Sequence, residues 1–297
     1  MMIIKHRRVW YVVGGLLMIA CVALVGIYGL RFGIDFTGGS LLEVNYTDTR
    51  PDVEAVRQAL GERGFEYGVV SPTGERGLMV RETPLSEEQH QAVLETLRVF
   101  GNMEELRFDS IGPSVGQTLR RSSMTALILV LVMIIVYVAW SFRSVSRPVQ
   151  SWKYGLMTVF SGLYAVMVAV GVAALAGEIN GLVVDAAFVA AILTILGYSV
   201  NDTIVVFDRI REQLKHQDRN FEGTVEAAVR QTMARSINTN LATLLALVAI
   251  LFFGGETVFN FVLILIVGIL TSTCSSIFLA SPLLVTWQQW AARRNSK

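Results

Sequence analysis

The sequence predicts a membrane α-helical bundle of six transmembrane helices together with one small α+β domain outside the bilayer. Three observations support this fold class. Of the 297 residues, 53% are hydrophobic and only 16% are charged, and the mean hydropathy of +0.53 is too high for a soluble chain. Six stretches come close to the roughly 20 apolar residues that cross a bilayer. One long polar segment, residues 31–121, carries 15 of the 24 acidic side chains.

The predicted spans divide the chain into four parts. Residues 1–30 hold the N-terminus and the first helix, residues 31–121 the external domain, residues 122–287 five further helices, and residues 288–297 a tail. The basic start MMIIKHRR is like that of a signal peptide, but no A-x-A cleavage site follows the first apolar stretch, so we expect it to remain as a helix. The predicted spans are 9–30, 122–141, 154–176, 182–207, 236–253 and 258–287.

The basic residues predict which side of the membrane each part faces. All 15 Lys and Arg residues outside 31–121 lie in the N-terminus, the second and fourth connections between spans, and the tail. The third and fifth connections, around Glu178 and Glu256, carry none. Because short cytoplasmic loops are enriched in Lys and Arg, we expect both termini and the loop 208–235 to be cytoplasmic and residues 31–121 to be external.

The external segment has the pattern of a small folded domain. Its ten basic and 15 acidic residues leave a formal charge of −5. Alternation in SLLEVNY is typical of a strand, and the S-x-x-Q spacing of Ser86 and Gln89 predicts a capping box. Gly64 is expected to end the first helix, and turn residues 72–74 to separate the middle strands. Strands and helices are expected at 40–46, 52–63, 67–71, 77–82, 86–101 and 104–110, which is the ferredoxin-like βαββαβ order.

The fourth span contains the strongest functional signal, because Asp202 lies within an otherwise apolar helix. An ionisable side chain in a span costs a few kcal/mol to insert, about 2.5–3.5 on insertion scales, so it usually marks a paired or functional site. Asn201 is its neighbour in the chain, and hydroxyl side chains lie on nearby turns of the same side. These are Thr194, Tyr198 and Ser199.

Arg235, at the start of the fifth span, is the predicted partner of Asp202, with Asn238 and Thr239 following it. The midpoint between the two charges falls near residue 218, in the polar stretch where the chain must turn, so they should lie at similar depths on antiparallel helices. The pattern leaves two other interpretations open. The pair could be a static link between helices, or Arg235 could extend to the cytoplasmic surface.

Glycines mark both connections between the external domain and the spans. They are Gly33, Gly38 and Gly39 in GIDFTGG, and Gly112 and Gly116 in IGPSVG. Such residues permit a hinge about which the domain moves, but they also suit any tight helix exit or entry. Asp35, within the first motif, could cap a turn or contact a substrate, and the pattern does not decide between them.

No signature of enzymatic or cofactor chemistry is visible. The sequence has no GxxxxGK and no HExxH motif. Cys21 and Cys274 fall in apolar runs without His or Cys at ligand spacing, and all three His lie in polar segments. A net charge of +1 gives no indication of nucleic-acid binding. We therefore expect no catalytic residue, no metal and no cofactor, and a proton path would have to use carboxylate, hydroxyl and water.

Four motifs together resemble a known family. GIDFTGG (33–39), IGPSVG (111–116), GYSVNDTIVVFDRIRE (197–212) and RSINTNLATLLALVAILFFGG (235–255) are similar, in the same order, to motifs of the SecF family of bacterial protein-export subunits. The resemblance covers nearly the whole chain. It implies an RND-type half of six spans that pairs with a SecD half in the bacterial cytoplasmic membrane.

The resemblance also implies a function. A SecF-type chain would work with SecD and the SecYEG translocon, using the proton motive force to help an unfolded preprotein across the membrane. Asp202 and Arg235 match the polar pair that is associated with proton transport in this family. Protons and membrane lipid would be its other partners. Two alternatives are half of an RND-type small-molecule or lipid exporter, which usually has a larger external domain, and a scaffold, which would not need an acid inside a span.

Overall fold

The computed structural model describes residues 3–65, 69–143, 149–214, 220–254 and 256–295. The chain forms two compact units. One comprises Met1–Leu30, Thr125–Leu182 and Ala187–Lys297, and the other comprises Arg31–Met124 and Val183–Ala186. The second unit therefore holds the predicted external domain together with four residues from a distant part of the chain.

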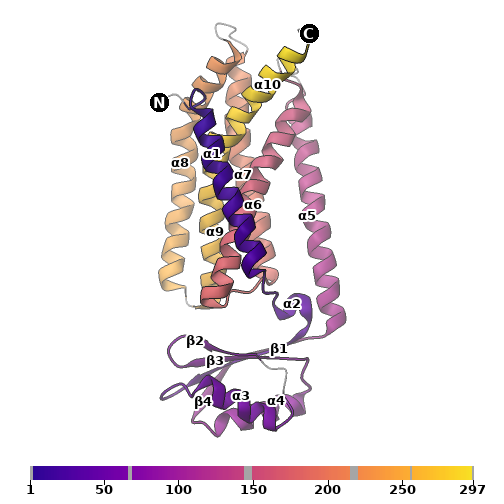
Figure 1. Ribbon diagram of the computed structural model, residues 1–297, viewed down its shortest axis with the longest axis vertical. Helices are drawn as coiled ribbons and strands as arrows, with labels where there is room; N and C mark the ends of the chain where they lie inside the picture. Colours follow the sequence, from indigo (N-terminus) through magenta and orange to yellow (C-terminus); the bar gives the residue numbers. More distant parts are fainter. Residues whose placement is uncertain (1–2, 66–68, 144–148, 215–219, 255, 296–297) are drawn as a thin grey trace. The chain divides into compact units, whose positions relative to one another are not determined.

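The first unit is a helical bundle, and six of the described helices are long and apolar enough to span a membrane, as predicted. The central helices are α6, α7 and the continuous α9–α10 segment, whose candidate spans are 61%, 44% and 56% buried, whereas α1, α5 and α8 are largely exposed (Figure 1). The helices are α1 (Arg7–Tyr28), α5 (Pro113–Ser141), α6 (Ser151–Asn180), α7 (Ala186–Leu214), α8 (Phe221–Phe253), α9 (Glu256–Ser275), the π-helical turn η1 (Ser276–Ala280) and α10 (Ser281–Asn295).

Some helix bounds differ from the predicted spans for local reasons. α7 begins at Ala186 rather than at residue 182, because Val184 makes a β-bridge with Phe32 and so has an extended backbone. α5 begins earlier than predicted, at Pro113, where proline is favoured because the first helical N–H has no intrahelical partner. α7 and α8 also extend into the polar 208–235 segment, whose turn lies outside the described residues.

The second unit contains a four-stranded antiparallel sheet of order β2-β3-β1-β4, as expected for the ferredoxin-like βαββαβ fold. α3 and α4 lie on one face of the sheet (Figure 1). The core between them contains Leu42, Val44 and Tyr46 from the central strand. The elements are α2 (Ile34–Thr37), β1 (Gly39–Tyr46), α3 (Val53–Glu62), β2 (Val69–Thr73), β3 (Gly77–Glu82), α4 (Glu87–Arg98) and β4 (Met103–Ile111).

Local signals account for most of these bounds. The capping box at α4 forms as predicted: Gln89 N–H donates to Ser86 Oγ over 3.3 Å, and Ser86 N–H donates to Gln89 Oε1 over 2.9 Å. Gly64, with φ of 89°, follows the end of α3. The predicted turn at 72–74 was placed too early, because Pro72 and Thr73 pair with β3 as the end of the edge strand β2. The first two residues of the predicted strand 67–71 lie outside the described residues.

Candidate functional site

Asp202 is buried where three helices of the bundle meet. Its side chain, on α7, is 2% exposed. Asn240 of α8 donates from Nδ2 to Asp202 Oδ2 over 2.6 Å, and the same amide nitrogen lies 2.6 Å from Thr273 Oγ1 of α9. The Thr273 hydroxyl oxygen is 3.2 Å from Asp202 Oδ2 and 3.0 Å from the Ile269 carbonyl oxygen. Because the hydroxyl group has a single proton, it donates to one of these two oxygens at a time. The carboxylate is therefore held by neutral donors that come from two other helices.

Arg235 does not contact Asp202 in this structure, so the predicted pairing is not observed here. The Arg235 side chain is exposed, as are those of Asn201, Asn238 and Thr239. No ion pair joins Asp202 to any basic residue of the described ranges. Of the five residues assigned to the site from the sequence, the structure places only Asp202 in the buried cluster.

The geometry of α8 explains this difference. Residues four apart share one face of a helix, so Ser236 and Asn240 point into the bundle together, while Arg235 and Thr239 share a neighbouring face. The estimate of equal depth also assumed that both helices leave the turn symmetrically. Asn240, five residues beyond Arg235, is the α8 residue that reaches Asp202, so α8 is displaced along its axis from the symmetric position.

Asn240 and Thr273 are site residues that the sequence argument missed. Asn240 ends the polar run SINTN (236–240) at the start of the fifth span, and Thr273 lies in the hydroxyl-rich run TSTCSS of the sixth span. A cluster of small polar residues in a span was a usable signal, because such side chains form hydrogen bonds between membrane helices. The signal shows that a residue is polar and buried, but it does not show which helix it faces.

Further polar atoms lie buried on the same helices without a hydrogen-bond partner among the described residues. They are Ser236 Oγ, Asn240 Oδ1 and Ser272 Oγ. A buried polar atom is normally hydrogen-bonded to protein or to ordered water, so these three oxygens are available as hydrogen-bonding groups for water.

A buried cluster of hydroxyl groups continues along α7 from Asp202. Ser199, one turn before Asp202, lies 3.4 Å from Ser161 Oγ of α6, and Ser161 Oγ is 2.7 Å from Ser275 Oγ of α9. Ser275 Oγ also lies 3.0 Å from the Ser272 carbonyl oxygen. The arrangement supplies carboxyl and hydroxyl groups of the kind that could relay a proton through an apolar bundle.

The five glycines predicted as hinge residues all belong to the second unit. A Cβ atom on Gly38 would lie 2.9 Å from Pro113 Cα, and one on Gly116 would lie 2.9 Å from Gly38 N. A Cβ on Gly39 would lie 2.6 Å from Glu82 O, and one on Gly33 would lie 3.3 Å from Val184 O, whereas Gly112 has open space. Close approach between backbones is therefore a sufficient reason for glycine at four of the five positions, and the hinge stays a prediction.

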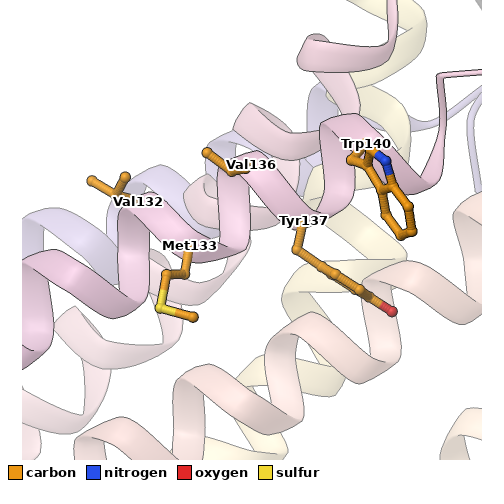
Figure 2. A pocket seen from close by; sticks show the side chains of 5 residues that line it. All are labelled: Val132, Met133, Val136, Tyr137 and Trp140. Carbon is orange, nitrogen blue, oxygen red and sulfur yellow. The ribbon is translucent and has the colours of Figure 1, made fainter.

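A shallow apolar hollow lies on one face of α5 (Figure 2). The five side chains along it are Val132, Met133, Val136, Tyr137 and Trp140. Apart from the Tyr137 hydroxyl and the Trp140 indole nitrogen, these side chains are apolar, so the hollow is suited to hydrocarbon. Within the described residues, no group of three or more His, Cys, Asp or Glu side chains could hold a metal ion.

Comparisons of the sequence agree with the motifs. A sequence-family model described as "Protein export membrane protein SecD/SecF, C-terminal" matches residues 91–290, and a second, "SecD/SecF GG Motif", matches residues 23–49. The protein translocase subunit SecF of Thermobaculum terrenum is 40% identical over 300 residues, covering 96% of this chain and 93% of that protein. The SecF subunit of Anaerolinea thermophila is 34% identical over 291 residues, covering 96% and 94%.

Solved structures give the same result. The crystal structure of SecDF from Thermus thermophilus, described as a translocon-associated membrane protein, matches with a TM-score of 0.85 and 31% identity. The match covers 96% of this chain and 38% of that one. SecDF in a super-membrane-facing form matches with a TM-score of 0.70 and 31% identity, covering 100% of this chain and 40% of that one. The chain thus spans about two fifths of the SecDF chains, and it belongs to the SecD/SecF family of protein export membrane proteins.

Proposed function

We propose that this chain is the SecF-type subunit of a protein translocase, which pairs with SecD and uses the proton motive force to assist preprotein movement through SecYEG. The observation that carries the proposal is Asp202, a buried acid held by Asn240 and Thr273 from two other helices. A proton gained by this carboxyl group removes the charge that the two donors solvate. Protonation therefore changes the bonds between α7, α8 and α9.

The driving force is of the right size for such a change. One elementary charge that crosses about 100 mV gains about 2.3 kcal/mol, which biases two conformations by roughly fiftyfold. That bias suffices to favour one arrangement of packed helices over another. Arg235 remains a proposed charge partner of Asp202, in a conformation other than this one, because its side chain is exposed here.

The exposed helices support the proposed SecD partner and lipid contacts. α1, α5 and α8 have candidate spans that are 11%, 6% and 11% buried. We propose that a SecD half covers part of this surface and that lipid covers the rest. The relatives named above are translocase subunits, and no observation favours half of a small-molecule or lipid exporter.

We further propose that both termini face the cytoplasm of the bacterial inner membrane. Backbone N–H groups of Ile3 and Ile4 donate to Glu226 of α8 over 3.0 and 2.7 Å, and Arg7 donates to Gln289 of α10 over 2.8 Å. The two termini therefore lie at the same end of the bundle (Figure 1). In a variant without the native cysteines, Glu75→Cys and Arg230→Cys should label from opposite sides of intact membranes, and labelling from the same side would contradict this orientation.

The experiment that tests the function compares wild type with Asp202→Asn in cells that depend on this chain. Asn keeps the shape of the side chain but cannot exchange a proton near neutral pH. We expect Asp202→Asn to copurify with SecD as wild type does while its stimulation of export is lost. Copurification with neither SecD nor SecYEG would contradict the proposed assembly, and normal export by Asp202→Asn would contradict the proton-driven mechanism.

A further inference from the structure

The glycine motif at residues 33–39 is bonded to the residues that lead into α7. Val184 N–H donates to Arg31 O over 2.7 Å, and Gly33 N–H donates to Val184 O over 2.8 Å. With the parallel bridge between Phe32 and Val184, these bonds form a short β-contact. Because of this contact, Val183–Ala186 belongs to the second compact unit although the residues on either side of it belong to the bundle.

Asp35 adds a side-chain bond to this contact. Its Oδ2 accepts a hydrogen bond from the N–H of Ala186, 2.7 Å away, although the two residues are 151 positions apart in the chain. Ala186 is the first residue of α7. The first N–H groups of a helix have no partner within the helix, and a carboxylate there is favoured by both the hydrogen bond and the helix dipole. Asp35 thus supplies the cap of α7 from a distant segment.

The same helix carries the buried acid. Asp202 lies 16 residues after Ala186 in the unbroken α7, which corresponds to about 24 Å at a rise of about 1.5 Å per residue. On the other side of Asp35, the chain reaches the start of β1 at Gly39 within four residues. Gly38 and Gly39 pack closely against the backbone of Pro113 and Glu82, so the connection from Asp35 to the sheet has little freedom to bend.

We propose that Asp35 is a positioning residue that ties the glycine motif to the N-terminal end of α7, so that a displacement of α7 at Asp202 is passed to β1 through residues 31–39. The proposal rests on the proposed function, because it requires that the protonation of Asp202 moves α7. It assigns a capping role to Asp35 instead of a contact with substrate. A cap needs only a side-chain oxygen, which Asn also provides, whereas an ionic contact with a substrate needs the charge.

The test uses variants of the full chain in its complex with SecD, compared by export stimulation at equal amounts of assembled complex. Asp35→Ala removes the acceptor, and Asp35→Asn replaces it without the charge. Ala186→Pro removes the N–H donor at the first helical position, where proline is tolerated. Asp48→Ala, an exposed acid elsewhere in the same unit, is the matched control.

We expect Asp35→Ala and Ala186→Pro each to lower export stimulation by about fivefold, the population change that the loss of one cap produces. The double variant should be no worse than either single one, because both remove the same bond. Asp35→Asn and Asp48→Ala should stay within about twofold of wild type. Should Asp35→Ala fail to accumulate, Ala186→Pro and Asp35→Asn decide the question.

Two results would overturn the proposal. Export by Asp35→Asn as poor as that by Asp35→Ala would mean that the charge matters and not the cap. Normal export by Ala186→Pro would mean that the bond to α7 is not needed. Asp202→Asn, measured in the same series, separates the two proposals: loss of export there with normal export by Asp35→Ala and Ala186→Pro would reject only the role of Asp35.

Discussion

A buried carboxyl group among neutral hydrogen-bond donors changes the charge of its site whenever it gains or loses a proton. Asp202 is such a group, because its observed partners are the Asn240 amide and the Thr273 hydroxyl. A permanent Arg partner would have held the carboxylate in its charged form. The site therefore suits proton exchange better in this arrangement than in the ion pair predicted from the sequence, and the two arrangements give different expectations for substitutions.

Asn240→Ala should impair export far more than Arg235→Ala does. The first change removes the 2.6 Å bond to Asp202, while the second removes an exposed side chain. A hydrogen bond to a charged group contributes about 1.5–3 kcal/mol, so we expect a loss of about tenfold or more for Asn240→Ala. Export stimulation at equal assembly measures both. A larger loss for Arg235→Ala would show that the ion pair dominates the working protein.

Glu82 offers a separate test in the second unit. Burial raises the pKa of its carboxyl group above the ordinary value of 4.5, and a backbone hydrogen bond at Thr83 opposes part of the rise. A raised pKa means that the folded state binds the proton more tightly than the unfolded state. Its stabilising contribution is therefore complete below pH 4.5 and is lost as the pH rises through the folded-state value.

Glu82→Gln stays neutral at every pH and should not show that loss. We expect the stability of the variant relative to wild type to increase as the pH is raised from pH 4 to pH 7, because only wild-type Glu82 becomes charged as the pH rises. Thermal unfolding of the detergent-solubilised chain at both pH values measures the difference. An equal difference at the two pH values would show that the Glu82 carboxyl does not titrate with folding.

Among the elements, the π-helical turn η1 connects the site to α1. Ser276 Oγ donates to Thr273 O over 3.0 Å, and Ser281 Oγ donates to Ser276 O over 2.9 Å. Phe278 in this turn packs on Trp10 of α1 with ring centroids 4.2 Å apart. Short π-helical turns inside α-helices are often found at functional sites. Here the turn begins three residues after the Asp202 partner Thr273, and its Phe278 and Leu279 side chains face α1.

Gly14→Val should destabilise the bundle, and Gly15→Val provides the matched control. A Cβ at Gly14 would lie 2.9 Å from a Leu279 methyl carbon, whereas a Cβ at Gly15 would have nothing within 4 Å. Both changes alter helix propensity equally, so their difference reports packing against η1. Overpacking typically costs about 1–3 kcal/mol. Equal thermal unfolding temperatures for the two variants would show that α1 does not depend on this contact.

Glycine packing in the second unit makes a similar comparison possible. Gly38→Ala introduces a Cβ 2.9 Å from Pro113 Cα at a φ of 73°, while Gly112→Ala enters open space. Gly38 combines this φ with a ψ of 164°, a backbone conformation that costs a non-glycine residue about 1–3 kcal/mol. We therefore expect Gly38→Ala to lower stability and export and Gly112→Ala to leave both nearly unchanged. A loss of export in Gly112→Ala with normal stability would instead support the predicted hinge.

At the scale of the whole molecule, the sequence predicts what depends on composition and short spacing. The six spans, the βαββαβ order of elements along the chain and the capping box of Ser86 and Gln89 follow from apolar runs, period-2 alternation and a three-residue spacing. Asp202 could be found because an acid in an apolar helix is conspicuous. Its partners Asn240 and Thr273 could not, because they depend on the rotation and axial displacement of three packed helices. The contact of Asp35 with Ala186 was also out of reach, since it joins segments 151 residues apart.

Proton flux through the assembled complex tests the central claim, that Asp202 is the proton-exchanging group, most directly. Wild-type chain and Asp202→Asn, each purified with SecD and reconstituted in vesicles, are compared for proton uptake under an imposed membrane potential. We predict flux that depends on the potential for wild type, and none above that of protein-free vesicles for Asp202→Asn at equal protein content. Equal flux through both complexes would contradict the account and leave Asp202 as a structural link between α7, α8 and α9.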